Sequence, residues 1–598
     1  MREESPQSPQ SPRPPRAAAS GGGIRPWVFW PAAAIAAAFI VFALVVPEAA
    51  DRAFGAIQAG IVSALNWYYV LIAAFFVAFA LVVGFSRFGS IRLGADDDEP
   101  EFSMISWFSL LFAAGMGIGL VFYGVSEPLS HFATPRPGVE GTPAELAQAA
   151  LSQTYLHWGV HAWSIYVVVG VALAYAFHRR KRPMTIRWAL EPVLGERRTR
   201  GGWGNAVDAA ALVGTIFGVA TSLGLGVLQI SAGLDTLGVL EATPLTQTAI
   251  IVVITAVVLW SVLSGVARGM KWLSNFNLAL AGVLLLYLLV TGPTTFLLRE
   301  FVQSIGNYLQ DFIALSFNVT AFQGAAGLAW QGSWTTFYWG WWISWAPFVG
   351  VFIARISRGR TVREFVAGVI LVPTLIGILW FSVLGGTAIW MELTGRAELI
   401  GTDGSVTVES ALFAMLAEVP GSAVVTVGAL VLIAIFFVTS ADSGALVMSM
   451  LATGGEVHPK RWVSVFFTLA TALIALALLF AGGLAALQTA AISIALPFSL
   501  VMLAICWATI VALRREIRAY DRAERAQFRD QIGEYYGLDV EEPVRRGIFS
   551  RPGRRQRRPA AEPFAIPERT IPDPATPEPA APEAGSSEAG PTPSPDER

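Results

Sequence analysis

Long apolar runs alternate with short polar connectors along most of the chain. A helix needs about 20 apolar residues to cross the hydrocarbon core of a bilayer. Runs of this length predict an all-α membrane protein with twelve transmembrane helices. The predicted spans are residues 27–47, 63–86, 104–125, 145–177, 206–238, 246–266, 273–295, 334–354, 362–391, 421–450, 461–481 and 485–513.

A different pattern separates the seventh and eighth spans. Phe301, Ile305, Tyr308 and Phe312 recur at helical spacing, and polar residues fill the remaining faces. Such a segment is amphipathic rather than apolar all round. We therefore predict an amphipathic helix over residues 297–318 that lies in the outer membrane interface.

Basic residues gather in alternate connectors. The connectors after the second, fourth, sixth, eighth and tenth spans carry most of them, with eight between Arg179 and Arg200. The other connectors carry only scattered arginines, such as Arg52, Arg136 and Arg396. Because basic loops stay on the cytoplasmic side, we predict that the even connectors and both termini are cytoplasmic.

The two ends of the chain differ from its apolar middle. Residues 1–25 are rich in Ser, Pro and Arg and predict a disordered cytoplasmic tail. Residues 514–598 predict a cytoplasmic extension that is first charged and helical, then basic from Arg545 to Arg558, and then disordered. The basic stretch is interpreted either as solvated tail or as a sensor of anionic membrane lipids.

The composition excludes a soluble protein, since only 14% of the 598 residues are charged and 54% are hydrophobic. We expect a multi-pass protein of the plasma membrane or cell inner membrane, with no nucleic acid among its partners. The single cysteine, Cys506, excludes a disulfide framework. Five histidines without evident partners give little support for an enzyme, and no cofactor is expected.

The segment from Trp334 to Phe348 concentrates five tryptophans and three other aromatic residues without a formal charge. Aromatic belts at membrane interfaces lie at the ends of spans. Trp341, Trp342 and Trp345 instead fall well inside the eighth span. Two interpretations stay open: ordinary helix packing, and an aromatic cage that holds a quaternary ammonium cation against ring faces.

The fourth span offers a second aromatic face, formed by Trp158, Trp163 and Tyr166. The same span has His157 and His161 at the spacing of two metal ligands on one helix face. No acidic or third ligand accompanies them in the sequence, so the pattern does not favour a metal site.

Two further segments inside predicted spans contain either repeated glycines or side-chain hydroxyl groups. Gly115, Gly117 and Gly119 alternate in the third span, which permits either close helix packing or an unwound segment with exposed carbonyl groups. Thr439 and Ser440 in the tenth span are oxygen ligands suited to Na⁺, or they bond back to their own helix.

These segments together resemble the betaine/carnitine/choline transporter family, over about residues 60–515. The resemblance is carried by Gly115–Gly119, Trp158–Tyr166, Trp334–Phe348 with Ala354–Arg360 after it, and Thr439–Ser443. It implies two five-helix inverted repeats of the leucine-transporter type and a homotrimer. It thereby divides the spans into two peripheral helices (26–102), a first repeat (103–296) and a second repeat (330–513).

The resemblance also implies roles for individual residues. The implied substrate box consists of Trp158, Trp163, Tyr166, Trp341, Trp342 and Trp345. The implied main sodium site consists of backbone carbonyls of Ala113, Met116 and Phe436 with the hydroxyls of Thr439 and Ser440. A second sodium site would involve Thr215 and Phe348, but Val219 stands where sodium-coupled relatives have another threonine. Either Thr221 or Ser222 substitutes there, or the site is altered.

The coupling ion and the substrate follow from smaller resemblances. Proton-coupled choline relatives tend to carry Asp at the position of Gly119, so the glycine favours Na⁺. Trp67–Tyr69 and Gly214–Gly218 look more like the choline branch. The expected function is Na⁺-coupled import of glycine betaine or choline. The alternatives are a proton-coupled choline or carnitine transporter and a solute sensor that does not transport.

Overall fold

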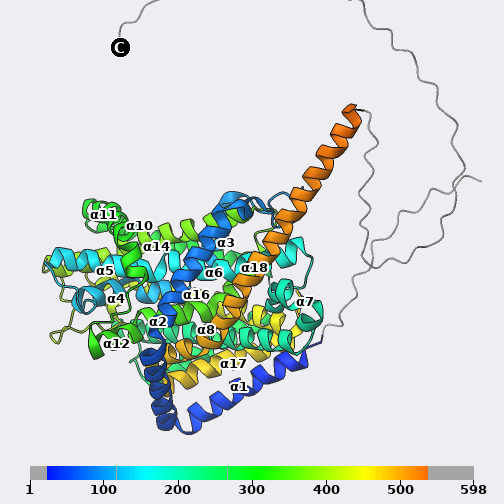
Figure 1. Cartoon of the computed structure of the whole chain (residues 1–598). Coiled ribbons are helices and arrows are strands. Elements are labelled where there is room, and N and C mark those ends of the chain that lie inside the picture. The colour runs from blue at the N-terminus through cyan, green and yellow to red at the C-terminus, as the bar shows by residue number, and fades with distance from the viewer. Residues whose placement is uncertain (1–22, 116, 265–266, 537–598) are drawn as a thin grey trace, which may run out of the picture. The chain divides into compact units, whose positions relative to one another are not determined.

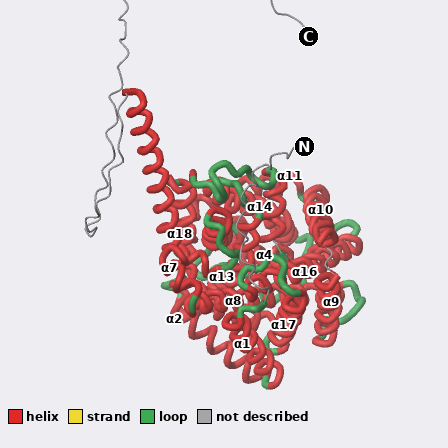
Figure 2. The backbone as a smooth tube through the Cα atoms, turned by 90° about the vertical axis from the view of Figure 1, so that its right-hand side faces the viewer, coloured by secondary structure: helices red, strands yellow, loops and turns green. Residues whose placement is uncertain are grey.

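The computed structural model describes residues 23–115, 117–264 and 267–536. The predicted N-terminal tail up to residue 22, Met116, and the basic stretch from Arg545 to Arg558 lie outside these residues. Met1–Gln527 forms one compact unit and Phe528–Arg598 a second, and the fold described below is that of the first. Figure 2 shows helices joined by loops, with no strand among the described residues.

The first half of the chain contains α1 (Pro26–Val45), α2 (Pro47–Phe85), η1 (Arg87–Ser90), α3 (Met104–Gly115), α4 (Ile118–Ala133), α5 (Pro143–Trp158), α6 (Val160–Ala174), η2 (Tyr175–Arg179), η3 (Ile186–Leu190), α7 (Glu191–Arg200), α8 (Gly202–Thr236), α9 (Pro244–Ser264) and α10 (Ala267–Thr291). The second half contains α11 (Thr294–Ser316), α12 (Gly324–Ser333), α13 (Thr335–Arg355), α14 (Val362–Leu393), α15 (Ala411–Ala417), α16 (Ser422–Thr453), α17 (Arg461–Phe480) and α18 (Gly483–Tyr536).

Local signals fix where several of these helices begin. The side chains of Thr142 and Thr361 each accept a hydrogen bond from the backbone N–H three residues later. The carboxylates of Glu145 and Glu364 in turn accept one from the backbone N–H of the threonine. These reciprocal bonds satisfy N–H groups that have no partner inside the helix. They define the starts of α5, which ends at Trp158, and of α14, which follows the aromatic helix α13 in sequence.

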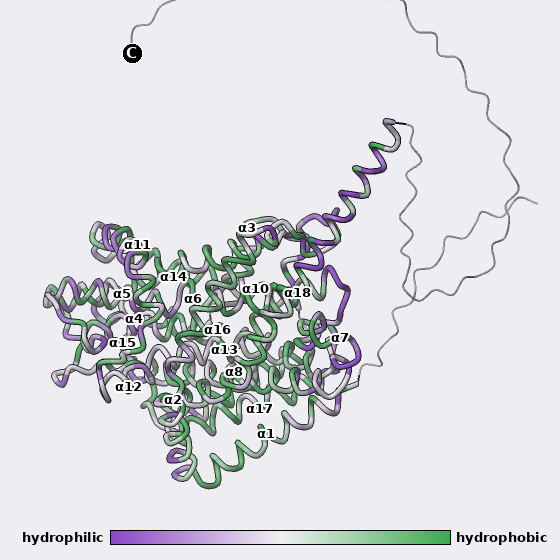
Figure 3. Tube along the Cα trace, viewed as in Figure 1, coloured by the Kyte–Doolittle hydropathy of each residue, from purple (hydrophilic) through white to green (hydrophobic). Residues whose placement is uncertain are grey.

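Among the described residues, ten helices are long and apolar enough to cross a membrane. The third and eighth predicted spans are not among these ten. The third corresponds to two separate helices, α3 and α4. The eighth is α13, whose tryptophans carry a polar N–H. Figure 3 shows hydrophilic residues near the ends of helices, around α7 on one side and near α12 and α15 on the other. The number twelve and the inverted-repeat arrangement stay predictions.

Two breaks interrupt predicted continuous spans. Gly117 separates α3 from α4 with an extended backbone (φ −116°, ψ −151°). Gly159 separates α5 from α6 directly after Trp158, where a side chain would meet the Tyr155 carbonyl oxygen at 2.5 Å. The last carbonyl groups of a helix lack an intrahelical donor, so each break leaves polar backbone available inside the protein.

The aromatic helix α13 packs against α6 and α8 in the interior. A Cβ added at Gly350 would lie 2.5 Å from Val169 Cγ1, and one added at Gly170 would lie 2.5 Å from Ile353 Cδ1. The two glycines therefore let α13 and α6 approach closely, as small residues do between membrane helices. On another side of α8, the helices α1 and α17 pack beside it (Figure 1).

The amphipathic segment predicted over 297–318 is the helix α11. Tyr308 is buried, and Phe301, Ile305 and Phe312 pack against the core as their spacing indicated. The opposite face also has apolar side chains, since Val302 is 69% exposed. Its location in the membrane interface stays a prediction. The short helix α12, which follows, was not indicated by any sequence pattern.

Candidate functional site

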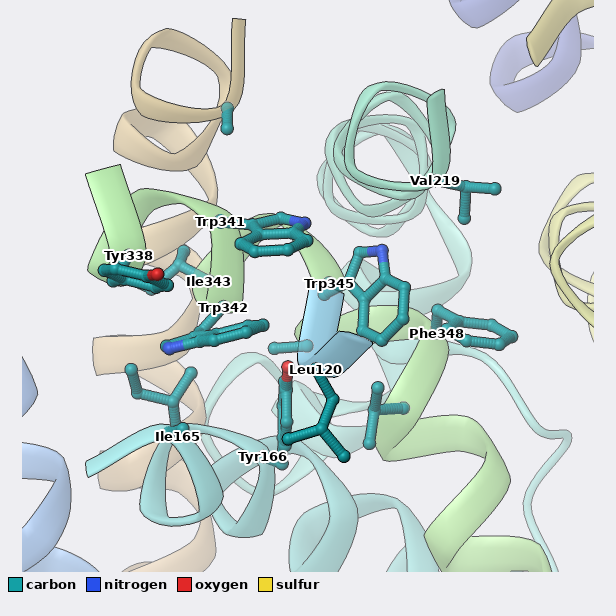
Figure 4. Close-up of a cluster of buried hydrophobic side chains, with 14 of the residues drawn as sticks. Leu120, Ile165, Tyr166, Val219, Tyr338, Trp341, Trp342, Ile343, Trp345 and Phe348 are labelled. Atoms are coloured by element: carbon teal, nitrogen blue, oxygen red, sulfur yellow. The ribbon is translucent and has the colours of Figure 1, made fainter. Parts of the chain in front are cut away.

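The aromatic residues of α13 and of the α5–α6 segment form one buried cluster (Figure 4). Trp341 and Trp342 stack with ring centroids 4.6 Å apart and an interplanar angle of 15°. Trp158 meets Trp342 edge-on at 5.0 Å and Trp341 at 6.1 Å. Tyr166 lies 6.2 Å from Trp342. Each of these side chains is 4% exposed or less.

The remaining two candidate box residues lie at the edges of this cluster. Trp345 is 6.4 Å from Trp341, and its ring also packs against Phe348 at 5.5 Å. Trp163 reaches the cluster through Tyr166, at 5.5 Å. The structure thus brings all six residues of the implied box into one neighbourhood, with Trp163 the most remote from α13.

Hydrogen bonds at the ring edges fix three of the tryptophans. Trp158 Nε1 donates to Glu127 Oε2 at 2.6 Å, and Trp342 Nε1 donates to the His157 carbonyl at 2.8 Å, next to the break at Gly159. Trp341 Nε1 donates to Ser222 Oγ at 3.2 Å. With these polar atoms bonded, Trp341 and Trp342 stack face to face and Trp158 meets them edge-on.

Two donors of the cluster have no such bond. Tyr166 OH and Trp345 Nε1 are buried and have no hydrogen-bond partner among the described residues. Figure 4 shows the Tyr166 hydroxyl directed toward the tryptophans of α13. Buried polar groups are nearly always bonded, so these two donors indicate a place where a polar ligand group fits.

The broken helix pair α3–α4 approaches this cluster through its glycines. A Cβ added at Gly119 would lie 2.4 Å from Trp341 Cη2 and 3.0 Å from Trp158 Cη2. A Cβ added at Gly117 would lie 3.3 Å from Trp345 Cη2 and 3.5 Å from Ser440 Oγ. The break therefore lies between the aromatic cluster and the α16 residues expected to bind sodium.

The implied sodium ligands that the structure describes lie on two helices. Ala113 is in α3, near the break, while Phe436, Thr439 and Ser440 are in α16. Thr439 Oγ1 donates to the Ile435 carbonyl at 2.9 Å and the Phe436 carbonyl at 3.2 Å, so it bonds to its own helix. Hydroxyl and carbonyl oxygens of this kind suit a hard cation.

The residues of the implied second sodium site are less well suited to bind a sodium ion. Thr215 Oγ1 donates to the Ala211 carbonyl at 2.8 Å, and a Cβ added at Gly444 would lie 3.2 Å from Val219, which packs there as an apolar residue. Thr221 Oγ1 donates to the Leu487 carbonyl at 3.3 Å. Ser222 instead supports Trp341, as described above.

Sequence reasoning missed Glu127, which the structure places beside Trp158. Its side chain is fully buried and also accepts bonds from Tyr338 OH and, at 2.7 Å, from His157 Nδ1. The third span was predicted to end at residue 125, whereas α4 continues to Ala133. An acidic residue inside an apolar helix was the available signal, and the early boundary concealed it.

His157 and His161 have different surroundings. The structure gives His157 the acidic partner, Glu127, that the sequence did not reveal. His161 stacks on Trp339 at 5.2 Å and packs against Phe312.

The chain was compared with known proteins. Residues 27–518 match the family described as "BCCT, betaine/carnitine/choline family transporter". An uncharacterised transporter of Mycobacterium tuberculosis is 48% identical over 83% of this chain and 84% of its own. The glycine betaine transporter OpuD of Bacillus subtilis is 42% identical, covering 83% of this chain and 96% of its own. The ectoine/glycine betaine/proline transporter EctP of Corynebacterium glutamicum is 39% identical, covering 84% and 82%.

These matches confirm the resemblance inferred from the sequence, and the matched relatives are transporters and not enzymes. The chain therefore belongs to the BCCT family of betaine/carnitine/choline transporters and is a multi-pass membrane protein.

Proposed function

We propose that the protein imports glycine betaine together with Na⁺ by alternating access, with the aromatic cluster as its substrate box. The observation that carries the proposal is the stacked pair of Trp341 and Trp342, met edge-on by Trp158 in a buried cluster. A quaternary ammonium group has no N–H to donate, so aromatic ring faces are its best partners.

The unpartnered Tyr166 hydroxyl favours glycine betaine over choline. It can donate to a carboxylate, and charge-assisted bonds of this kind are about twice as strong as neutral ones. Glycine betaine carries a carboxylate, whereas choline carries only a hydroxyl. The printed names of OpuD and EctP include the same substrate.

The position of Gly117 supports coupling to Na⁺. A Cβ on this residue would lie close to both Trp345 and Ser440, so substrate and ion would share one unwound backbone segment. Residue 119 is a glycine and supplies no carboxylate for a proton. The breaks at Gly117 and Gly159 supply hinge positions for alternating access.

Reconstitution tests this proposal. Proteoliposomes would receive labelled glycine betaine, choline, carnitine or ectoine, with a Na⁺ gradient or a proton gradient imposed separately. We expect Na⁺-driven accumulation of glycine betaine. Proton-driven choline or carnitine uptake would overturn both the substrate and the ion, and saturable binding without counterflow would identify a sensor instead.

A further inference from the structure

A compact group of potential metal ligands lies beside the aromatic cluster. Glu127 and His131 come from α4, and His157 comes from α5. One ligand atom of each lies within 4.8 Å of the others, and each side chain is 2% exposed or less. Glu127 Oε1 is 2.7 Å from His157 Nδ1 and 3.5 Å from His131 Nε2.

His131 is buried although no hydrogen bond within the described residues satisfies its ring nitrogens. Its ring packs against Trp334 at 4.5 Å and Trp330 at 5.5 Å. These contacts hold an unpartnered imidazole beside the Glu127 carboxylate, although a buried polar group is normally bonded.

The atoms of Glu127 and His157 that point away from the centre of the group contact neighbouring polar side chains. His157 Nε2 lies 3.0 Å from Thr335 Oγ1 and 3.1 Å from Gln153 Nε2. Glu127 Oε2 accepts bonds from Trp158 Nε1 and Tyr338 OH, as described above. Bonds of this kind on the atom that does not face the ion orient a carboxylate ligand. A histidine that binds a metal through Nδ1 donates its Nε2–H, which Thr335 Oγ1 can accept, whereas Gln153 Nε2 is itself a donor.

The group also has a cavity beside it, at His131. This cavity has a volume of about 270 Å³, and its walls include His131, Arg136, Gln153 and Asp311. This volume is large enough for water, which could complete the coordination of an ion held by three protein ligands.

We propose that Glu127, His131 and His157 bind one divalent transition-metal ion of the Zn²⁺ class. Two imidazole nitrogens and one carboxylate oxygen form a ligand set found in zinc sites with an open position. Hard cations such as Mg²⁺ or Ca²⁺ prefer oxygen ligands throughout and fit less well. The site is separate from the α16 oxygens expected to bind Na⁺ and does not depend on the proposed transport function. It would hold Glu127, and through it Trp158, in place.

The test measures binding of Zn²⁺ to the full-length protein in nanodiscs, after removal of any histidine tag. Titration against a fluorescent chelator should give one ion per chain. His131→Phe keeps the ring against Trp334 and Trp330 but removes both nitrogens. We expect it to weaken Zn²⁺ binding at least tenfold, and His131→Gln to do the same. His161→Phe is the matched control, since His161 is also buried and unpartnered but packs on Trp339.

Visible absorption of bound Co²⁺ provides a readout that a purely structural effect would not change. A Co²⁺ spectrum typical of four or five ligands should appear with wild type and His161→Phe and be absent with both His131 variants. Absence of Zn²⁺ binding by wild type would overturn the proposal. So would equal binding by wild type and a folded His131 variant.

Discussion

At the scale of single residues, the edge hydrogen bonds determine what the aromatic cluster can bind. Trp158, Trp341 and Trp342 use their N–H groups on Glu127, Ser222 and the His157 carbonyl. In the proposed function, the ring faces that remain free would attract the cation, and the unbonded Tyr166 hydroxyl would bind the polar end of the substrate.

Replacing Trp342 by Leu tests the contribution of one ring face. A desolvated cation–π contact contributes about 2 kcal/mol, which corresponds to roughly 30-fold in affinity. We expect Trp342→Leu to raise the KM for glycine betaine uptake by about that factor, as measured in proteoliposomes. Trp203→Leu, at a tryptophan that is 69% exposed, should leave the KM unchanged. Equal KM values for the two variants would refute a role for the Trp342 face.

Gly119 tests how closely the unwound segment must approach the rings. Its added Cβ would lie 2.4 Å from Trp341 Cη2, far inside van der Waals contact. Overpacking of this kind costs about 1–3 kcal/mol, so Gly119→Ala should reduce uptake roughly tenfold or more by displacing Trp341 and Trp158. Gly214→Ala is the control, because its Cβ would meet the Ser344 carbonyl oxygen at an ordinary 3.6 Å. Normal transport by Gly119→Ala would contradict the packing argument.

At the scale of elements, buried charge joins the η3 turn to α8. Asp208 is fully buried, and it accepts bonds from Arg187 Nε at 2.5 Å and from the Arg187 backbone N–H at 2.8 Å. Removing one partner of a buried pair leaves an uncompensated charge, which costs about 3–5 kcal/mol. Asp208→Ala should therefore lower the thermal unfolding midpoint in detergent by several degrees.

The control for that experiment is a comparable pair on the surface. Glu196 and Arg200 lie 2.8 Å apart, but both are at least half exposed. Exposed pairs contribute about 0–1 kcal/mol, so Glu196→Ala should hardly change the midpoint. If both variants unfold alike, the Arg187–Asp208 pair does not stabilise this junction.

A third ion pair makes the free energy of unfolding depend on pH. Asp98, in the α2–α3 connector, pairs with Arg358, in the α13–α14 connector, at 3.0 Å. The hydrogen bonds from Arg358 hold the pKa of Asp98 below its ordinary value of 3.8. A lowered pKa means that the stabilisation is present above this ordinary value and is lost as pH falls through the folded-state pKa.

Comparing wild type with Asp98→Asn across pH tests this pair. We expect wild type to unfold at a higher temperature at pH 7, and the difference to disappear well below pH 3.8. Arg358→Gln should reproduce this pattern, because it removes the same pair. A difference that persisted at the lowest pH would point to another role for Asp98.

The helices themselves could largely be predicted from the sequence, whereas their breaks could not. Apolar length predicts a span without tertiary information, and spacing predicted α11 within three residues of each observed end. Gly117 and Gly159 are different, since glycine in a membrane helix permits both a straight, closely packed helix and a break. The surrounding structure selects between them.

The same distinction applies to the candidate site. Trp341, Trp342 and Trp345 are neighbours in sequence, and their position inside a span was visible at once. The meeting of Glu127 with His157 joins α4 to α5 and depends on how the two helices pack. No spacing rule on one helix could have predicted it.

At the scale of the whole membrane unit, the even connectors come together in space. Arg92 Nη1 donates to the Gly359 carbonyl at 2.8 Å, which joins the α2–α3 and α13–α14 connectors. Arg179, at the end of η2, donates to the Gly94 carbonyl at 2.8 Å. Three of the basic connectors therefore lie at one end of the helices, as a shared cytoplasmic side requires.

Cysteine labelling tests which side that is. Cys506 is 2% exposed and should not react, so the natural chain serves as its own unlabelled background. Asp403→Cys places a thiol in the exposed α14–α15 connector, and Arg198→Cys places one at the exposed end of α7. With a membrane-impermeant maleimide, we expect Asp403→Cys to react in intact cells and Arg198→Cys to react only after permeabilisation. The reverse pattern would invert the membrane orientation that the basic connectors predict.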